Sequence, residues 1–440
     1  MTAPVLTPKA SAPFTPVVSF EEALATWARI GVLSFGGPTV QIALMHKIIV
    51  DEKKWLDEAR YLNALSFCML LPGPEAMQLA TYVGWRLHGL KGGLAAGLLF
   101  VLPGALVVLA MSMIYGAFGN VPLVEAIFLG IKAAVLVIVI EALLRIAKRA
   151  LKLREHWIIA ALSFLAIFFL GAPFPLIILA AALFGFFRAT GAEAPQSAAP
   201  ALIAPSTTVR TIGVWTAIWF APLLALAGLF GRDHVLSQLS LFFSKLAVVT
   251  FGGAYAVLAY MGQDVVTRYG WLDAGAMMDG LGLAETTPGP LILVTEFVGY
   301  LSAYRHGGEP AWTMGLLGAF VALWATFAPC FLWIFAGAPY IEWITHQPRL
   351  KGALAAITAA VVGVILNLAI WFALHVFFKE VALNELGPLK LWIPTLTSLD
   401  WRVVVLSILS GFLLLVRHWS IPAVLAVAAA LALVIRFISF

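Results

Sequence analysis

The chain has 440 residues, of which 62% are hydrophobic and only 11% are charged, whereas about 25% of residues are charged in an ordinary soluble domain. This composition excludes a soluble enzyme, a disordered scaffold and a partner of nucleic acids. The net charge of +5 comes from Lys and Arg residues in loops beside apolar segments, a pattern that orients membrane proteins. We therefore expect a polytopic membrane protein whose surroundings are the lipid bilayer.

Five regions are predicted in chain order. Residues 1–19 contain no long apolar run, which indicates a short tail and not a cleaved signal peptide. Residues 189–210 are rich in Ala and Pro, a composition typical of linkers. This linker separates a first transmembrane repeat at 20–188 from a connecting transmembrane helix at 211–234, which leads to a second repeat at 235–440.

The two repeats are recognisable as copies of one another. When the chain is shifted so that Phe35-Gly36-Gly37 falls on Phe251-Gly252-Gly253, Trp55-Leu56-Asp57 falls on Trp271-Leu272-Asp273. At the same shift Pro72-Gly73-Pro74 falls on Pro288-Gly289-Pro290, and nearly a third of positions 33–74 are identical. Rare residue types carry much of this match, so chance is a poor explanation. The two halves are predicted to share one fold.

Several apolar segments approach the roughly 20 residues that a helix needs to cross a bilayer. The predicted crossings are 94–117, 125–145, 156–170, 174–188, 211–230, 312–335, 353–374, 401–416 and 420–438. The Phe-Gly-Gly and Pro-Gly-Pro segments are apolar but broken, and they could form kinked crossings or re-entrant hairpins. The re-entrant arrangement places most of the 27 Lys and Arg residues on the side of the N-terminus, which the positive-inside rule makes cytoplasmic.

In that arrangement the two repeats have opposite orientations. The expected fold is therefore an all-α polytopic membrane protein, built as an inverted-topology repeat with broken or re-entrant helices. Such an architecture is typical of secondary transporters. The expected location is the inner (plasma) membrane.

The broken segments are the predicted substrate-binding region, because non-helical backbone at membrane depth must face protein or a water-filled cavity. Prolines after the breaks suit the start of a new helix, whose free N–H groups favour an anion. Glycine lets that anion approach the backbone. The binding residues predicted on this ground are Gly36, Gly37, Gly73, Gly252, Gly253 and Gly289.

Cationic and hydroxyl side chains near the breaks extend this prediction. Arg29 and Lys245 occupy equivalent positions in the two halves and could form a symmetric cradle for a dianion, or could extend to the membrane surface. Ser34 and Thr250 are also equivalent and could donate hydroxyl groups to an oxyanion. Lys132, within the segment 125–145, could line the anion path or pair with a buried partner.

Two carboxylates are candidates for proton coupling. Glu75 follows Pro74 at a predicted helix start, where a capping role is the simpler interpretation. Glu296 lies in the corresponding arm of the second half. If either carboxylate is buried, it could exchange a proton during transport.

Other classes of chemistry lack sequence support. The chain contains no phosphate-binding G-x-x-x-x-G-K-[ST] motif, so ATP is not expected to drive the protein directly. It also contains no H-E-x-x-H or G-x-S-x-G motif, so an enzyme is not expected. Two cysteines and eight scattered histidines predict no metal centre. No cofactor is expected.

The run FGGPTVQIALMHKIIVDEKKWLD, followed by LLPGPEAMQLATYVGWRLHG, resembles the chromate ion transporter family. The run TFGGAYAVLAYM with WLDAGAMMDGLGLAETTPGP resembles the second domain of its long-chain members. The resemblance implies export of chromate from the cytoplasm, driven by an ion gradient and conferring chromate resistance. Sulfate, another tetrahedral dianion, is the natural competitor.

The leading hypothesis is a chromate exporter driven by the proton motive force, with an anion site between the four broken helices. The alternatives are a transporter of sulfate or another oxyanion, and an anion channel. A homodimer is a candidate assembly.

Overall fold

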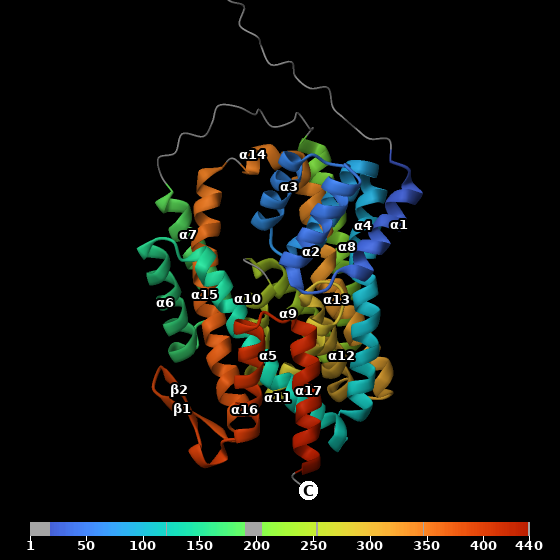
Figure 1. Cartoon of the computed structure of the whole chain (residues 1–440). Helices are drawn as coiled ribbons and strands as arrows, with labels where there is room; N and C mark the ends of the chain where they lie inside the picture. Colours follow the sequence, from blue (N-terminus) through green and yellow to red (C-terminus); the bar gives the residue numbers. More distant parts are fainter. Residues whose placement is uncertain (1–17, 120, 190–204, 252–253, 346, 439–440) are drawn as a thin grey trace, which may run out of the picture.

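The computed structural model describes residues 18–119, 121–189, 205–251, 254–345 and 347–438. It is almost entirely helical (Figure 1). The glycines Gly252 and Gly253, predicted to bind substrate, lie outside the described residues. The first half comprises α1 (Phe20–Leu33), α2 (Gly37–His46), the π-helical η1 (Lys47–Glu52), α3 (Glu58–Leu70), α4 (Glu75–Phe118), α5 (Pro122–Ala150), α6 (Arg154–Leu170) and α7 (Phe174–Arg188).

Helix α8 (Pro205–Phe230) connects the halves. The second half contains α9 (Val235–Val249), α10 (Ala254–Gln263), η2 (Asp264–Arg268), α11 (Ala274–Thr286), η3 (Leu291–Leu293), α12 (Val294–His306), α13 (Ala311–Gly337), η4 (Ala338–Tyr340), α14 (Ile341–Thr345) and α15 (Pro348–Phe377). It ends with β1 (Val381–Leu386), β2 (Leu389–Pro394), η5 (Leu396–Ser398), α16 (Trp401–Gly411), η6 (Phe412–Val416) and α17 (Ile421–Ile438).

The order of elements repeats. In each half two short helices flank the Phe-Gly-Gly segment, a π-helical turn follows, and a third helix precedes Pro-Gly-Pro. The third helices begin alike, because Asp57 accepts a hydrogen bond from the Arg60 N–H and Asp273 accepts one from the Ala276 N–H, each at 2.8 Å. Such carboxylate caps satisfy amide groups that a helix start leaves free. The antiparallel hairpin β1–β2 is an addition to the second half.

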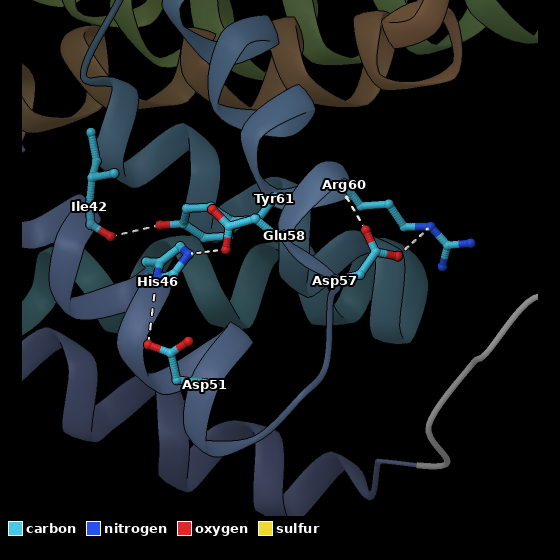
Figure 2. A network of polar contacts seen from close by, with 7 residues as sticks. All are labelled: Ile42, His46, Asp51, Asp57, Glu58, Arg60 and Tyr61. Atoms are coloured by element: carbon cyan, nitrogen blue, oxygen red, sulfur yellow. Dashed lines mark hydrogen bonds and ion pairs between the residues drawn. The ribbon is translucent and has the colours of Figure 1, made fainter.

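Polar contacts fix the connection between α2 and α3 (Figure 2). The Tyr61 hydroxyl donates to the Ile42 carbonyl at 2.7 Å, and His46 contacts both Glu58 and Asp51. Trp55, in the same connection, is buried. Charged groups thus remain at the molecular surface while the aromatic side chain anchors the turn.

Among the described residues, six helices are long and apolar enough to cross a membrane: α4, α5, α8, α13, α15 and α17. The predicted crossings at 156–170, 174–188 and 401–416 coincide with shorter helices. Helix α4 includes both arms of one hairpin, since His88 and Gly89 leave helical geometry inside it. Helices α1 and α2, of 14 and 10 residues, extend only about 21 and 15 Å, which is less than a bilayer.

The halves are intertwined. Helix α5 of the first half packs against α11, α15, α16 and α17, and α15 packs in turn against α6 and α7. Figure 1 shows α3 and α14 near one end of the molecule, and α11 and the β-hairpin nearer the other.

Candidate functional site

The helix breaks of one half pair with those of the other. The Gly289 N–H donates to the Ser34 carbonyl at 2.7 Å, and the Gly73 N–H donates to the Thr250 carbonyl at 2.8 Å. These glycines have φ values of +90° and +117°, which side-chain-bearing residues rarely adopt. Each Pro-Gly-Pro turn is therefore closed by the segment before the opposite Phe-Gly-Gly.

Gln41 reinforces one of these junctions. Its Nε2 donates to the Gly289 carbonyl at 2.6 Å and to the Ser34 carbonyl at 3.2 Å. The Gly73 and Gly289 amides are therefore not free for an anion in this structure, because both already have backbone acceptors. The sequence predicted the positions of the breaks, but it did not predict that each break forms hydrogen bonds with the other half.

The space between the breaks is almost closed. A hollow of about 10 Å³ is lined by Gln41, Glu75, Thr250 and the two Pro-Gly-Pro turns, among other residues. Such a volume suits about one water molecule, which is smaller than a tetrahedral oxyanion. Among the three breaks that the structure describes, this hollow is too small for the predicted anion site.

The hydroxyl groups predicted to bind an oxyanion are directed elsewhere. Ser34 Oγ donates to the Ile30 carbonyl, and Thr250 Oγ1 donates to the Leu246 carbonyl. Both bonds close on the preceding turn of the same helix. In this structure neither hydroxyl donates into the small hollow, and their binding of an oxyanion stays a prediction.

A larger opening of about 480 Å³ lies beside the first Phe-Gly-Gly; we call it the basic cavity. It is lined by the start of α2 and by residues of α5, α10 and α15. Its polar and charged lining residues are Thr39, Glu75, Arg145, Arg149, Lys152, His156, Tyr255, Lys351 and Thr358. Glu75 also lines the small hollow, so this carboxylate stands between the two spaces.

The basic cavity is suited to anions. Gly36 and Gly37 have φ values of +82° and +78°, and no side chain caps the start of α2. Consecutive amides in such a turn form an anion-binding concavity. Arg145 is paired with Glu141, whereas Arg149 and Lys351 have no ion pair among the described residues. Cations in a cleft concentrate negatively charged ligands.

The two predicted cradle cations are separated. Arg29 pairs with Glu52 at 3.5 Å and its side chain is 56% exposed, which places it at the surface. Lys245 lies 5.7 Å from the centre of the Tyr260 ring and lines a different cavity of about 430 Å³, with Asp264, Arg268 and Lys390. The predicted symmetric cation pair is therefore wrong.

The remaining predicted residues are buried or paired. Lys132 Nζ lies 3.3 Å from Asp279 Oδ2, which corresponds to the buried-partner alternative. Glu296 is 1% exposed, and its Oε2 has no hydrogen-bond partner among the described residues. The sequence interpretation did not single out Arg149, Lys152 and Lys351, which line the basic cavity.

Comparison with known proteins points to one family. A family model described as chromate transporter matches residues 22–186 and 237–434. A chromate transport protein of Cupriavidus metallidurans is 31% identical over 362 residues, covering 81% of this chain and 84% of the relative. A chromate transport protein of Pseudomonas aeruginosa is 31% identical, covering 80% of each chain. An uncharacterized transporter of Methanocaldococcus jannaschii is 28% identical, covering 81% and 85%. No solved structure matches the chain significantly.

Proposed function

The chain belongs to the chromate transporter family, a family of transporters and not of enzymes, and from this premise we propose that it exports chromate from the cytoplasm. Export would be driven by the proton motive force and would confer chromate resistance. The observation that carries the proposal is the basic cavity, where exposed cations converge on the glycine turn before α2.

The membrane potential favours this direction. Moving one charge across a membrane changes the free energy by about 2.3 kcal/mol per 100 mV, and chromate carries two negative charges. With the interior negative, the potential drives the dianion outward. The small hollow beyond Glu75 supports alternating access and argues against a continuous channel.

We assign Glu75 as a group that exchanges protons with the basic cavity, because it lines both that cavity and the hollow. Glu296 is a second candidate, since burial without a partner disfavours its charged form. We also propose that the protein resides in the inner membrane with a cytoplasmic N-terminus, which places the basic cavity on the cytoplasmic side.

Chromate uptake into everted membrane vesicles tests the function. Export appears there as uptake, and we expect a proton gradient, acidic inside, to raise accumulation above the level given by the membrane potential alone. A sulfate transporter would instead carry labelled sulfate that trace chromate does not displace. Vesicles from cells without the protein serve as the control, and equal chromate uptake in both would contradict the proposal.

We further propose that the repeats at 20–188 and 235–440, joined by the helix at 211–234, have inverted orientations. Asp51 and Thr267 are exposed and occupy equivalent positions of the two halves. We expect Asp51→Cys to react with an impermeant thiol reagent only from the cytoplasmic side, and Thr267→Cys only from the other side. Both variants are made in a Cys68→Ser, Cys330→Ser background, so that only the introduced cysteine can react with the reagent. The two native cysteines are free and buried. Labelling of both from one side would contradict inversion.

A further inference from the structure

A charged pair lies where the halves meet, with its carboxylate buried and its lysine partly exposed. Asp279 of α11 is 3% exposed. Its Oδ2 lies 3.3 Å from Lys132 Nζ of α5 and accepts a hydrogen bond from the Tyr115 hydroxyl of α4 at 2.7 Å. Its Oδ1 is buried and has no hydrogen-bond partner among the described residues. Among the described residues, Oδ2 of this carboxylate therefore pairs with a cation, whereas Oδ1 accepts no hydrogen bond.

Charged groups connect this pair to the surface. The Asp273 side chain is 69% exposed and pairs with Arg305 of α12 at 3.5 Å. A Cβ on Gly275 would lie 2.9 Å from Asp273 Oδ1 and 3.0 Å from Lys132 Nζ, so Asp273 and Lys132 converge on the same glycine. The charged and titratable groups facing Asp279 are thus Lys132, Tyr115 and Asp273, with Arg305 behind Asp273.

The repeat provides an internal comparison. Asn63 corresponds to Asp279 at the shift of 216 residues that aligns the two Phe-Gly-Gly segments. After a ten-residue change of offset, Ala133-Ala134-Val135 falls on Ala359-Ala360-Val361, and Lys132 then corresponds to Thr358. The Thr358 hydroxyl bonds within its own helix, to the Leu354 carbonyl. The same architecture therefore forms at the matching location with two neutral side chains. Since a buried ion pair contributes little net stability compared with neutral residues, the charges at 132 and 279 require another explanation.

We propose that the Lys132–Asp279 pair is the proton-binding site on the side opposite the basic cavity; this rests on the proton-driven export proposed above. A proton from the Asp273 end binds Oδ1 of Asp279, and the neutralised carboxyl group releases Lys132. Helix α5 also carries Arg145 and Arg149 of the basic cavity, so freeing it from α11 changes the substrate site. The proton then leaves toward the cytoplasm, and Asp279 recaptures Lys132.

The test compares wild type with Asp279→Asn and with the double variant Lys132→Thr, Asp279→Asn, which introduces the neutral residue types found at the equivalent positions Thr358 and Asn63. Two quantities are measured in everted vesicles: chromate exchange without gradients, and accumulation under a gradient of one pH unit. For wild type we expect the gradient to raise accumulation by up to about tenfold per coupled proton. For both variants we expect exchange within about threefold of wild type and no response to the pH gradient.

Asp279→Asn alone could fail to fold because it leaves Lys132 without its partner carboxylate. The double variant removes both charges, so it keeps the test decisive. A double variant that still responds to the pH gradient, or that is stable in the membrane but exchanges no chromate, overturns the proposal. Absence of exchange in wild type contradicts the proposed function instead. The same comparison is then made with sulfate as the transported anion. If the pH gradient raises sulfate accumulation equally in wild type and in the double variant, the proposed role of the pair is overturned.

Discussion

Replacing both Arg149 and Lys351 by glutamine is expected to raise the KM for chromate on the order of 100-fold while leaving the amount of protein in the membrane unchanged. Both side chains line the basic cavity from different helices, α5 and α15. Each cation removed is expected to cost about 1.4 kcal/mol of binding free energy, which corresponds to about tenfold in affinity. An attraction of this size is modest for a cation and a dianion near a protein surface. Initial rates of uptake into everted vesicles measure the change.

Lys148→Gln is the matched control, because Lys148 is exposed on the same helix as Arg149 but does not line the cavity. It removes a similar charge and should change KM less than twofold. The attraction is electrostatic, so raising the salt concentration should increase the wild-type KM more than that of the double variant. An unchanged KM in the double variant would remove the basic cavity from the transport path.

Substituting valine for Gly104 should prevent accumulation of folded protein. A Cβ at this position would lie 2.1 Å from the carbonyl oxygen of Pro288, so α4 approaches the second Pro-Gly-Pro turn without room for a side chain. The oxygen belongs to the backbone, and moving it would disturb the Gly289–Ser34 hydrogen bond. Overpacking of this kind costs about 3 kcal/mol. The yield of monodisperse protein in detergent and its melting temperature report the effect.

Gly213→Val provides the comparison, since Gly213 is also helical, in α8, but a Cβ there would meet nothing within 4 Å. We expect that variant to retain wild-type yield and melting temperature. Equal behaviour of the two variants would show that the contact between α4 and the turn does not stabilise the protein.

The sequence predicted those parts of the fold that local residue types determine. Glycine and proline located the breaks, apolar length located the major helices, and the shared Trp-Leu-Asp helped to align the two halves. These features depend on backbone freedom and hydrophobicity within a few residues. The partner of each break was not predictable, because Gly73 meets Thr250 only when both halves are folded.

The candidate site was predicted less completely for the same reason. Arg29 was expected to face the nearby break, but the loop after α2 brings Glu52 to it. Lys351 and Arg149 are distant in sequence and converge only through packing of α5 on α15. Equivalence between repeats predicts a shared fold, whereas different residue types at equivalent positions, such as Asn63 and Asp279, permit different roles.

The exchanged hydrogen bonds have a consequence for biosynthesis. The acceptor for the Gly73 amide, Thr250, leaves the ribosome only after the intervening chain has been made. At 5–20 residues per second, the delay is on the order of ten to forty seconds. Throughout that interval the N-terminal portion lacks the acceptor that its Gly73 amide has in the folded protein, so this junction becomes complete only when the later portion has been made.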